Sequence, residues 1–136
     1  MTAKIEDFAD DRFAAENGIC YLEVGEGFAR TTVTIESRHL NSLGIVHGGT
    51  LFTLAATALF AAANSRGRTA VGTNLNLSCL QAVSAGRLEA RATEFARSRR
   101  TSSCQVEVVD QRGRLVATLQ GTAYLKDAPF PPRQTA

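Results

Sequence analysis

The stretch from Gly48 to Ser65 constrains the fold more than any other part of this sequence. It contains no charged residue, and from about Gly49 to Asn64 it is rich in alanine and leucine and free of proline and of interior glycine. These residue types favour a helix. The helix is apolar on nearly every side, so other elements must wrap around it. It is a poor membrane span, because threonines and an asparagine interrupt its short apolar runs.

Most of the remaining sequence predicts strands. Between residues 73 and 80, asparagine and serine alternate with leucine and cysteine, which is the period of two of a β-strand. Gly25-Glu26-Gly27 is a hairpin signal, and residues 110–113 form a turn. Residues 36–46 read as a loop that leads into the helix. The expected strands cover residues 19–24, 28–35, 73–80, 86–96, 101–109 and 114–125.

The predicted fold is α+β. Strands joined by tight turns imply an antiparallel sheet, and one sheet curled around one apolar helix covers both apolar surfaces. We therefore expect five or six strands wrapped around one long buried helix. The length of 136 residues suits a single domain over residues 1–136. An N-terminal amphipathic helix is expected at about 5–17, and a loose, proline-containing tail at about 127–136.

Composition excludes several classes of protein. The net charge of +2 is too small to argue for a nucleic acid or membrane partner. Acidic residues crowd the N-terminus, which has no signal-peptide pattern, so we expect a cytoplasmic protein. Cys20, Cys79 and Cys104 are far apart and lack ligand spacing, which argues against a disulfide framework and against a metal site. We expect them to be buried, reduced thiols within strands.

The segment at residues 39–65, HLNSLGIVHGGTLFTLAATALFAAANS, resembles the phenylacetic acid degradation (PaaI-type) branch of the hotdog-fold acyl-CoA thioesterases. The later segments VGTNLNLSCLQAV and VVDQRGRLVATLQGTAYL also resemble that family, so the resemblance covers about residues 8–125. It implies a hotdog fold, with homodimers that share a continuous sheet and assemble into homotetramers. It also implies hydrolysis of acyl-CoA at sites shared between subunits, with CoA as part of the substrate and no metal or redox cofactor.

Three residues of this sequence match the family's site directly. Gly48 begins the helix, where N–H groups have no intrahelical partner and the helix dipole is positive. Such an N–H suits the thioester oxygen, which gains charge during attack, although two glycines could simply make the turn. His47 has a supporting role, either orienting the substrate or holding the loop. Asn41 either positions water or the thioester, or is an ordinary turn residue.

The family's helix aspartate falls on Ala56. That carboxylate attacks the thioester or activates water, and alanine can do neither. A general base contributes about 10²–10⁴ in rate, so we predict an impaired enzyme. No acidic residue between Glu36 and Glu89 could substitute for the missing carboxylate. Thr73 lies near a position where some relatives keep a hydroxyl that orients the water.

A run of basic and hydroxyl residues separates two of the predicted strands. It could bind the phosphates of CoA, as the resemblance implies, or it could be a solvated hairpin tip. The run consists of Arg97, Ser98, Arg99, Arg100 and Thr101.

Three functions remain open on the sequence. The first is an acyl-CoA thioesterase for aryl or medium-chain substrates, impaired by Ala56. The second is a non-catalytic hotdog protein that binds acyl-CoA. The third is a dehydratase of hydroxyacyl thioesters. It ranks last because its chemistry pairs a histidine with a helix carboxylate, and this sequence has the histidine but not the carboxylate.

Overall fold

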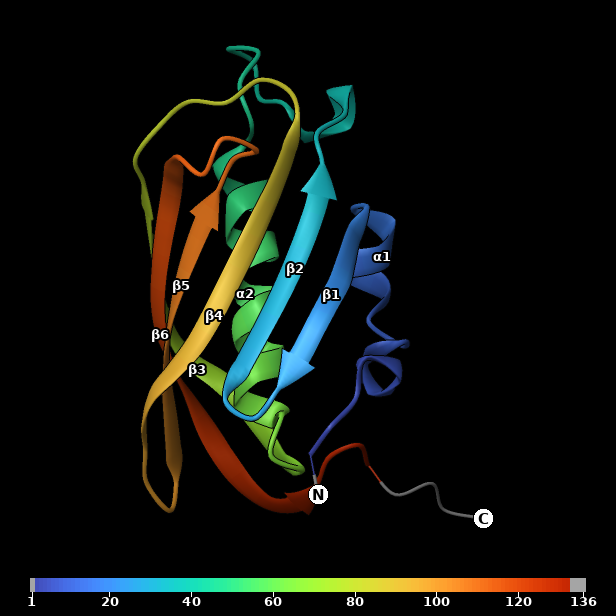
Figure 1. Cartoon of the computed structure of the whole chain (residues 1–136), viewed down its shortest axis with the longest axis vertical. Coiled ribbons are helices and arrows are strands. Elements are labelled where there is room, and N and C mark those ends of the chain that lie inside the picture. Colours follow the sequence, from blue (N-terminus) through green and yellow to red (C-terminus); the bar gives the residue numbers. More distant parts are fainter. Residues whose placement is uncertain (1, 133–136) are drawn as a thin grey trace.

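A six-stranded antiparallel sheet curls around helix α2 (Gly48–Asn64) in the computed structural model, which describes residues 2–132 (Figure 1). The strand order β1-β2-β4-β5-β6-β3 leaves β1 and β3 at the two edges. The expected α+β architecture, with one sheet around one long helix, is confirmed. The strands are β1 (Ile19–Gly25), β2 (Phe28–Thr34), β3 (Arg68–Cys79), β4 (Arg87–Arg97), β5 (Thr101–Val109) and β6 (Leu115–Pro129).

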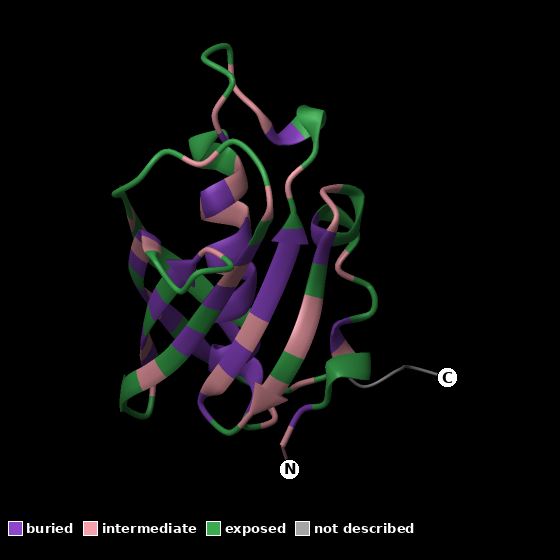
Figure 2. Cartoon of the chain, turned by 45° about the horizontal axis from the view of Figure 1, so that its top comes forward, coloured by how far each residue is buried: buried purple, intermediate pink, exposed green. Residues whose placement is uncertain are grey.

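The concave face of the sheet holds small and branched side chains. Ala90, Ala92 and Val106 are fully buried and share a core with Leu54 of α2. The residues between them face solvent, which gives the alternation of buried and exposed positions along the strands in Figure 2. Gly121 of β6 lies where there is no room for a side chain. A Cβ there would lie 2.8 Å from the carbonyl oxygen of Asn74 and 2.9 Å from a methyl carbon of Leu59.

The sheet does not cover α2 on every side. Thr53 and Ala56 are half-buried, and Phe60 is 37% exposed. These residues follow Gly49 at intervals of three and four, so they form one uncovered stripe along the helix. Within residues 2–132, no helix is long and apolar enough to cross a membrane.

The N-terminal region differs from the single helix expected over 5–17. It forms a 3₁₀ turn, η1 (Ile5–Phe8), and a short helix, α1 (Arg12–Glu16). The break occurs because Asp11 caps α1, and its Oδ1 accepts a hydrogen bond from the N–H of Ala14 at 3.1 Å. Phe8 then packs against the ring of Phe130, with centroids 4.9 Å apart.

Two further expectations need correction. The segment from residue 127 is not loose at first, because β6 runs to Pro129 and the N–H of Phe130 donates to the carbonyl of Gly67. The rest of the expected tail, residues 133–136, lies outside the described residues. All three cysteines lie in strands and are free, but only Cys104 is buried, whereas Cys20 and Cys79 are exposed.

Asn64 connects the end of α2 to the edge strand. Its side chain is fully buried, donates to the carbonyls of Phe60 (2.8 Å) and Ala70 (3.1 Å), and accepts from the N–H of Ala70 (2.8 Å). These bonds pair both the N–H and the carbonyl of Ala70, which point away from β6.

We expect Asn64→Ala to lower the free energy of unfolding by about 1–3 kcal/mol, because it leaves buried backbone groups of Ala70 unpaired. Urea denaturation measures the loss. The matched control is Asn76→Ala, at an exposed position of the same strand, which should stay within about 0.5 kcal/mol of the parent. Equal effects of the two substitutions would contradict this role of Asn64.

Candidate active site

The loop before α2 is held by a buried histidine. His39 closes the 3₁₀ turn η2 (Ser37–His39) and is 2% exposed. Its Nδ1 accepts from the N–H of Glu36 (2.9 Å), and its Nε2 lies 2.7 Å from the carbonyl oxygen of Asn17. Since a carbonyl can only accept, Nε2 carries the proton. The carbonyl of His39 in turn accepts from the N–H of His47 at 2.8 Å, which sets where α2 begins.

Asn41 and His47 organise the same loop with their side chains. Oδ1 of Asn41 accepts from the N–H groups of Leu43 (2.9 Å) and Ile45 (3.3 Å). His47 is the N-cap of α2, and its Nδ1 accepts from the N–H of Gly49 at 2.8 Å. Both side chains therefore have the structural role that was one of the alternatives for each.

Gly48 is different, because no neighbour among the described residues requires a glycine there. A Cβ at this position would meet no atom within 4 Å, and its φ is not in the left-handed region. Its N–H, at the first position of the helix, has no acceptor among residues 2–132. By contrast, a Cβ on Gly49 would lie 2.9 Å from Nδ1 of His47. Gly48 thus presents a free donor in open space at the positive end of a helix.

A cavity of about 310 Å³ contains this position. Its volume falls within the range of small-molecule sites. Two of its lining residues are hydrogen-bonded to each other, since the N–H of Val46 donates to the carbonyl of Val83 at 2.7 Å. A larger hollow of about 870 Å³, between Phe8, Phe60 and Phe130, includes neither Asn41 nor Gly48. The residues lining the smaller cavity are Asn41, Ile45, Val46, Gly48, Leu51, Cys79, Leu80, Gln81, Ala82, Val83 and Val116.

Two predicted residues lie outside this cavity within one chain. Ala56 is on the uncovered stripe of α2, about 12 Å along the helix from Gly48. Thr73 is the extra residue of a bulge between Gly72 and Asn74 of β3, and its hydroxyl donates to the carbonyl of Thr122 at 3.1 Å. Both residues are open to contact from outside the chain.

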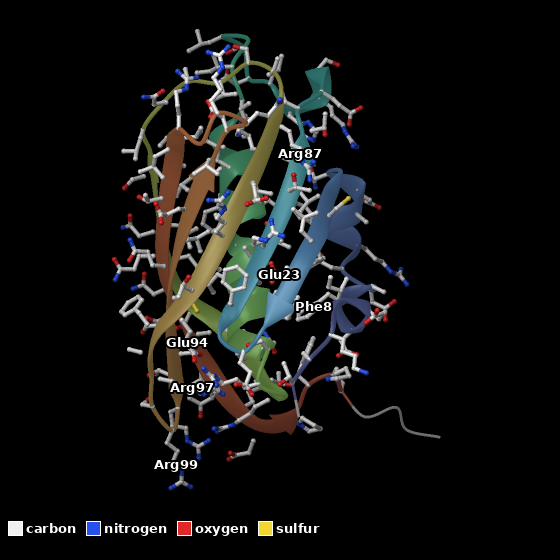
Figure 3. The ribbon with its side chains drawn as sticks, in the orientation of Figure 1. Phe8, Glu23, Arg87, Glu94, Arg97 and Arg99 are labelled. Carbon is white, nitrogen blue, oxygen red and sulfur yellow. The ribbon has the colours of Figure 1, made fainter. Side chains whose placement is uncertain are left out.

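The basic turn between β4 and β5 lies at the opposite end of α2. Arg66, just past the helix, binds Glu94 at 2.9 Å, and Glu94 also binds Arg97 at 2.9 Å. Figure 3 shows Glu94, Arg97 and Arg99 together at this end of the molecule. With 17 residues, α2 separates Gly48 from this turn by about 25 Å.

Most of the charge of the turn is already paired. Arg100 binds Asp127 at 3.0 Å, and the hydroxyls of Ser98 and Thr101 bond to each other at 2.8 Å. Of the three arginines, Arg99 alone has no ion pair within the described part of the chain. The structure thus keeps the turn apart from the cavity of its own chain. Nor do residues 2–132 contain a group of His, Cys, Asp or Glu side chains that could hold a metal ion.

The sequence does not predict the cavity residues contributed by the end of β3. From its pattern Cys79 is expected to be a buried thiol and Leu80 to end a strand. The alternation did contain the signal, since Cys79 shares a face with Leu75 and Leu77, which pack on the core beside α2. What the sequence lacked was the position of that face relative to the start of the helix.

Comparisons with known proteins identify the family and agree with the fold. Residues 43–117 match the family model of the Thioesterase superfamily. The acyl-coenzyme A thioesterase PaaI of Escherichia coli is 34% identical over 118 residues, covering 86% of this chain and 84% of that protein. The solved structure of the E. coli PaaI protein from the phenylacetic acid degradation operon superposes with a TM-score of 0.86 at 31% identity, covering 90% and 89% of the two chains. A mutant of PaaI from Thermus thermophilus gives a TM-score of 0.80 at 38% identity, over 84% and 98%.

The pH dependence of stability tests the ion pairs of Glu94, at the end of α2 away from Gly48. Burial alone would raise the pKa of Glu94, but hydrogen bonds from Ser102, Arg97 and Arg66 outweigh it and hold the pKa below its ordinary value. A carboxyl whose pKa is depressed in the folded state stabilises the fold at high pH and loses that effect as pH falls through the folded pKa.

We expect Glu94→Gln to cost about 1–3 kcal/mol at pH 7. Because an unfolded glutamate titrates near pH 4.3, the difference from the parent should shrink below about pH 4. Urea denaturation across pH 3–8 measures it, with Glu107→Gln as the control at an exposed position that forms no ion pair within the described chain. A cost for Glu94→Gln that does not depend on pH would contradict an ionic origin.

Proposed function

Because this chain belongs to the Thioesterase superfamily, we propose that it hydrolyses acyl-CoA with an aryl or medium-chain acyl group. The reaction is slow in this proposal because Ala56 stands where the family has a carboxylate. The E. coli relative is named an acyl-coenzyme A thioesterase, which supports this activity. The more specific substrate is our inference from the cavity and from the E. coli relative. CoA enters as part of the substrate, and the proposed reaction uses no metal or redox cofactor.

The free N–H of Gly48 is the observation that carries the proposal. In thioester hydrolysis the carbonyl oxygen becomes negative as the tetrahedral intermediate forms, and a preorganised N–H lowers the barrier most at that point. The donor lies on the wall of the cavity, at the positive end of α2. The absence of a side chain at Gly48 lets the carbonyl reach it. Asn41 and His47 keep the donor in place by fixing the loop and the first turn.

The cavity suits a compact apolar acyl group. Its apolar lining includes Val46, Leu51, Val83 and Val116, and its two amides are those of Asn41 and Gln81. An apolar lining with a few polar groups is typical of small-molecule sites. The exposed Leu80, at 53%, extends the apolar surface at its edge.

We also propose that the site is completed by a second copy of the chain. Strand β3 is an edge strand whose residues from Val71 to Asn74 are exposed, so two such edges can pair and join the sheets. The basic turn is about 25 Å from Gly48 in one chain, so the Arg99 that contacts the CoA phosphates belongs to the partner in this arrangement. Homodimers would then assemble further into homotetramers. The free thiols of Cys20 and Cys79 suit a reducing compartment such as the cytoplasm.

We expect Ala56→Asp to raise kcat/KM by about 10²–10⁴, because it supplies the carboxylate that activates water or attacks the thioester. The assay follows CoA release from hexanoyl-CoA, phenylacetyl-CoA and ring-hydroxylated phenylacetyl-CoA. Ala56→Asn is the control, since it has nearly the same shape as aspartate but cannot act as a base. If all three proteins bind acyl-CoA and none cleaves it, the chain is a binding protein. A parent as fast as the Asp variant would mean that another group supplies the chemistry.

We expect Gly48→Ala to leave the free energy of unfolding unchanged, or to raise it by up to about 1 kcal/mol, because alanine favours a helix and the added Cβ meets open space. The same change should lower kcat/KM by about 10²-fold by keeping the carbonyl from the N–H. Gly25→Ala is the matched control, because its Cβ also meets nothing within 4 Å and it lies outside the cavity. Full activity of Gly48→Ala would refute the donor role.

A further inference from the structure

One buried polar side chain has no hydrogen-bond partner within the described chain. Seven polar residues of that part of the chain are buried, and six of them form side-chain hydrogen bonds within it. The seventh is Thr57 of α2, which is 7% exposed. Since buried polar side chains are nearly always paired, this exception needs a physical explanation. The six paired residues are Thr31, Thr32, His39, Asn64, Ser65 and Ser102.

The hydroxyl of Thr57 remains at the surface of the chain. No side-chain oxygen or nitrogen of residues 2–132 is both fully buried and unpaired, so the hydroxyl oxygen keeps some contact with the outside. The two threonines before it on α2 use their hydroxyls within the chain. Thr53 donates to the carbonyl of Gly49 at 2.7 Å, and Thr50 donates to that of His39 at 3.4 Å. Thr57 makes no such bond, which leaves its hydroxyl for a group from outside the chain.

Helix geometry places this hydroxyl beside position 56. Thr57 follows Ala56 directly, at the margin of the uncovered stripe of α2. Thr53 is three residues from Ala56 and four from Thr57, so its side chain neighbours both on the helix surface. Ala56 adds only a methyl group, and the two hydroxyls therefore supply the polar groups of this part of the helix.

We propose that Thr57 is a positioning residue that binds and orients the water that attacks the thioester, an inference that rests on the proposed hydrolysis of acyl-CoA. The water can accept from the Thr57 hydroxyl and donate to the oxygen of Thr53, whose own proton is used in the bond to Gly49. The water oxygen bonds to the carbonyl carbon, and the bond to the CoA sulfur breaks. One proton of the water goes to that sulfur, and the other leaves to solvent as the carboxylic acid ionises.

This role differs from that of a carboxylate at position 56. A threonine hydroxyl is not a base at neutral pH, so it holds the water without removing its proton. The two groups act on the same water, so Thr57 should matter both with alanine and with aspartate at position 56. Loss of one neutral hydrogen bond from the attacking water corresponds to about 3–10-fold in rate.

The first test measures CoA release from hexanoyl-CoA by Thr57→Val, since valine has nearly the shape of threonine and lacks the hydroxyl. We expect kcat to fall by about 3–10-fold in the parent and in Ala56→Asp, with KM within about twofold. Thr57→Ser keeps the hydroxyl and should hold kcat within about twofold of the parent.

Urea denaturation of the same variants separates this role from a structural one. The midpoint of Thr57→Val should equal or exceed that of the parent, because no hydrogen bond within the chain is lost and valine suits a buried position. Thr31→Val is the matched control. Its buried hydroxyl donates to the carbonyl of Leu54 at 2.9 Å, so its midpoint should fall.

Two kinetic results would overturn the role of Thr57. An unchanged kcat in Thr57→Val would show that the hydroxyl does not act, and a rise in KM alone would show that it binds the substrate instead of the water. A lower urea midpoint, or a loss of activity that accompanies a change of size in gel filtration, would assign the hydroxyl to the fold or to contact between chains. All of these leave the proposed function in place if Ala56→Asp releases CoA. Failure of both the parent and Ala56→Asp to release CoA would overturn the proposed function itself.

Discussion

The close contact between α2 and the concave face of the sheet is the constraint on which the other features depend. An apolar helix of this kind cannot remain in water, and a curled sheet of alternating pattern has one face to cover. The two can meet because the strands have small side chains beneath the helix, and Gly121 has no side chain. There the methyl groups of Leu59 and Leu75 occupy the space that a side chain would need. A single methyl at this point would force Leu59 of α2, Leu75 or the backbone at Asn74 to shift.

That contact fixes both ends of the helix, and the ends carry the polar groups. At the start, His39 and His47 hold the loop, and Gly48, whose N–H has no acceptor among residues 2–132, lines a cavity to which β3 and β6 also contribute. At the end, Asn64 pairs with the backbone of β3, and Arg66 reaches Glu94. The free donor and the basic turn therefore cannot approach each other within one chain. A ligand that uses both must bridge two chains or extend along the whole helix.

Features set by local pattern were predictable from the sequence, and features set by long-range contacts were not. The uncharged run before Ser65 gave the helix almost to its ends, and the alternation around Asn76 gave a strand. The bulge at Thr73 escaped because it depends on pairing with β6, a strand distant in sequence. His39 looked like a loop residue because its partners lie on Asn17 and Glu36. Exposure of Cys79 was missed because alternation shows which residues share a face, and not how far the helix extends over it.

Loss of the carboxylate from position 56 need not remove the rest of the machinery. An oxyanion donor and a general base act on different atoms, the carbonyl oxygen and the attacking group, so one can persist without the other. Gly48 depends only on the backbone and on where α2 begins, neither of which Ala56 alters. What position 56 governs is the source of the nucleophile.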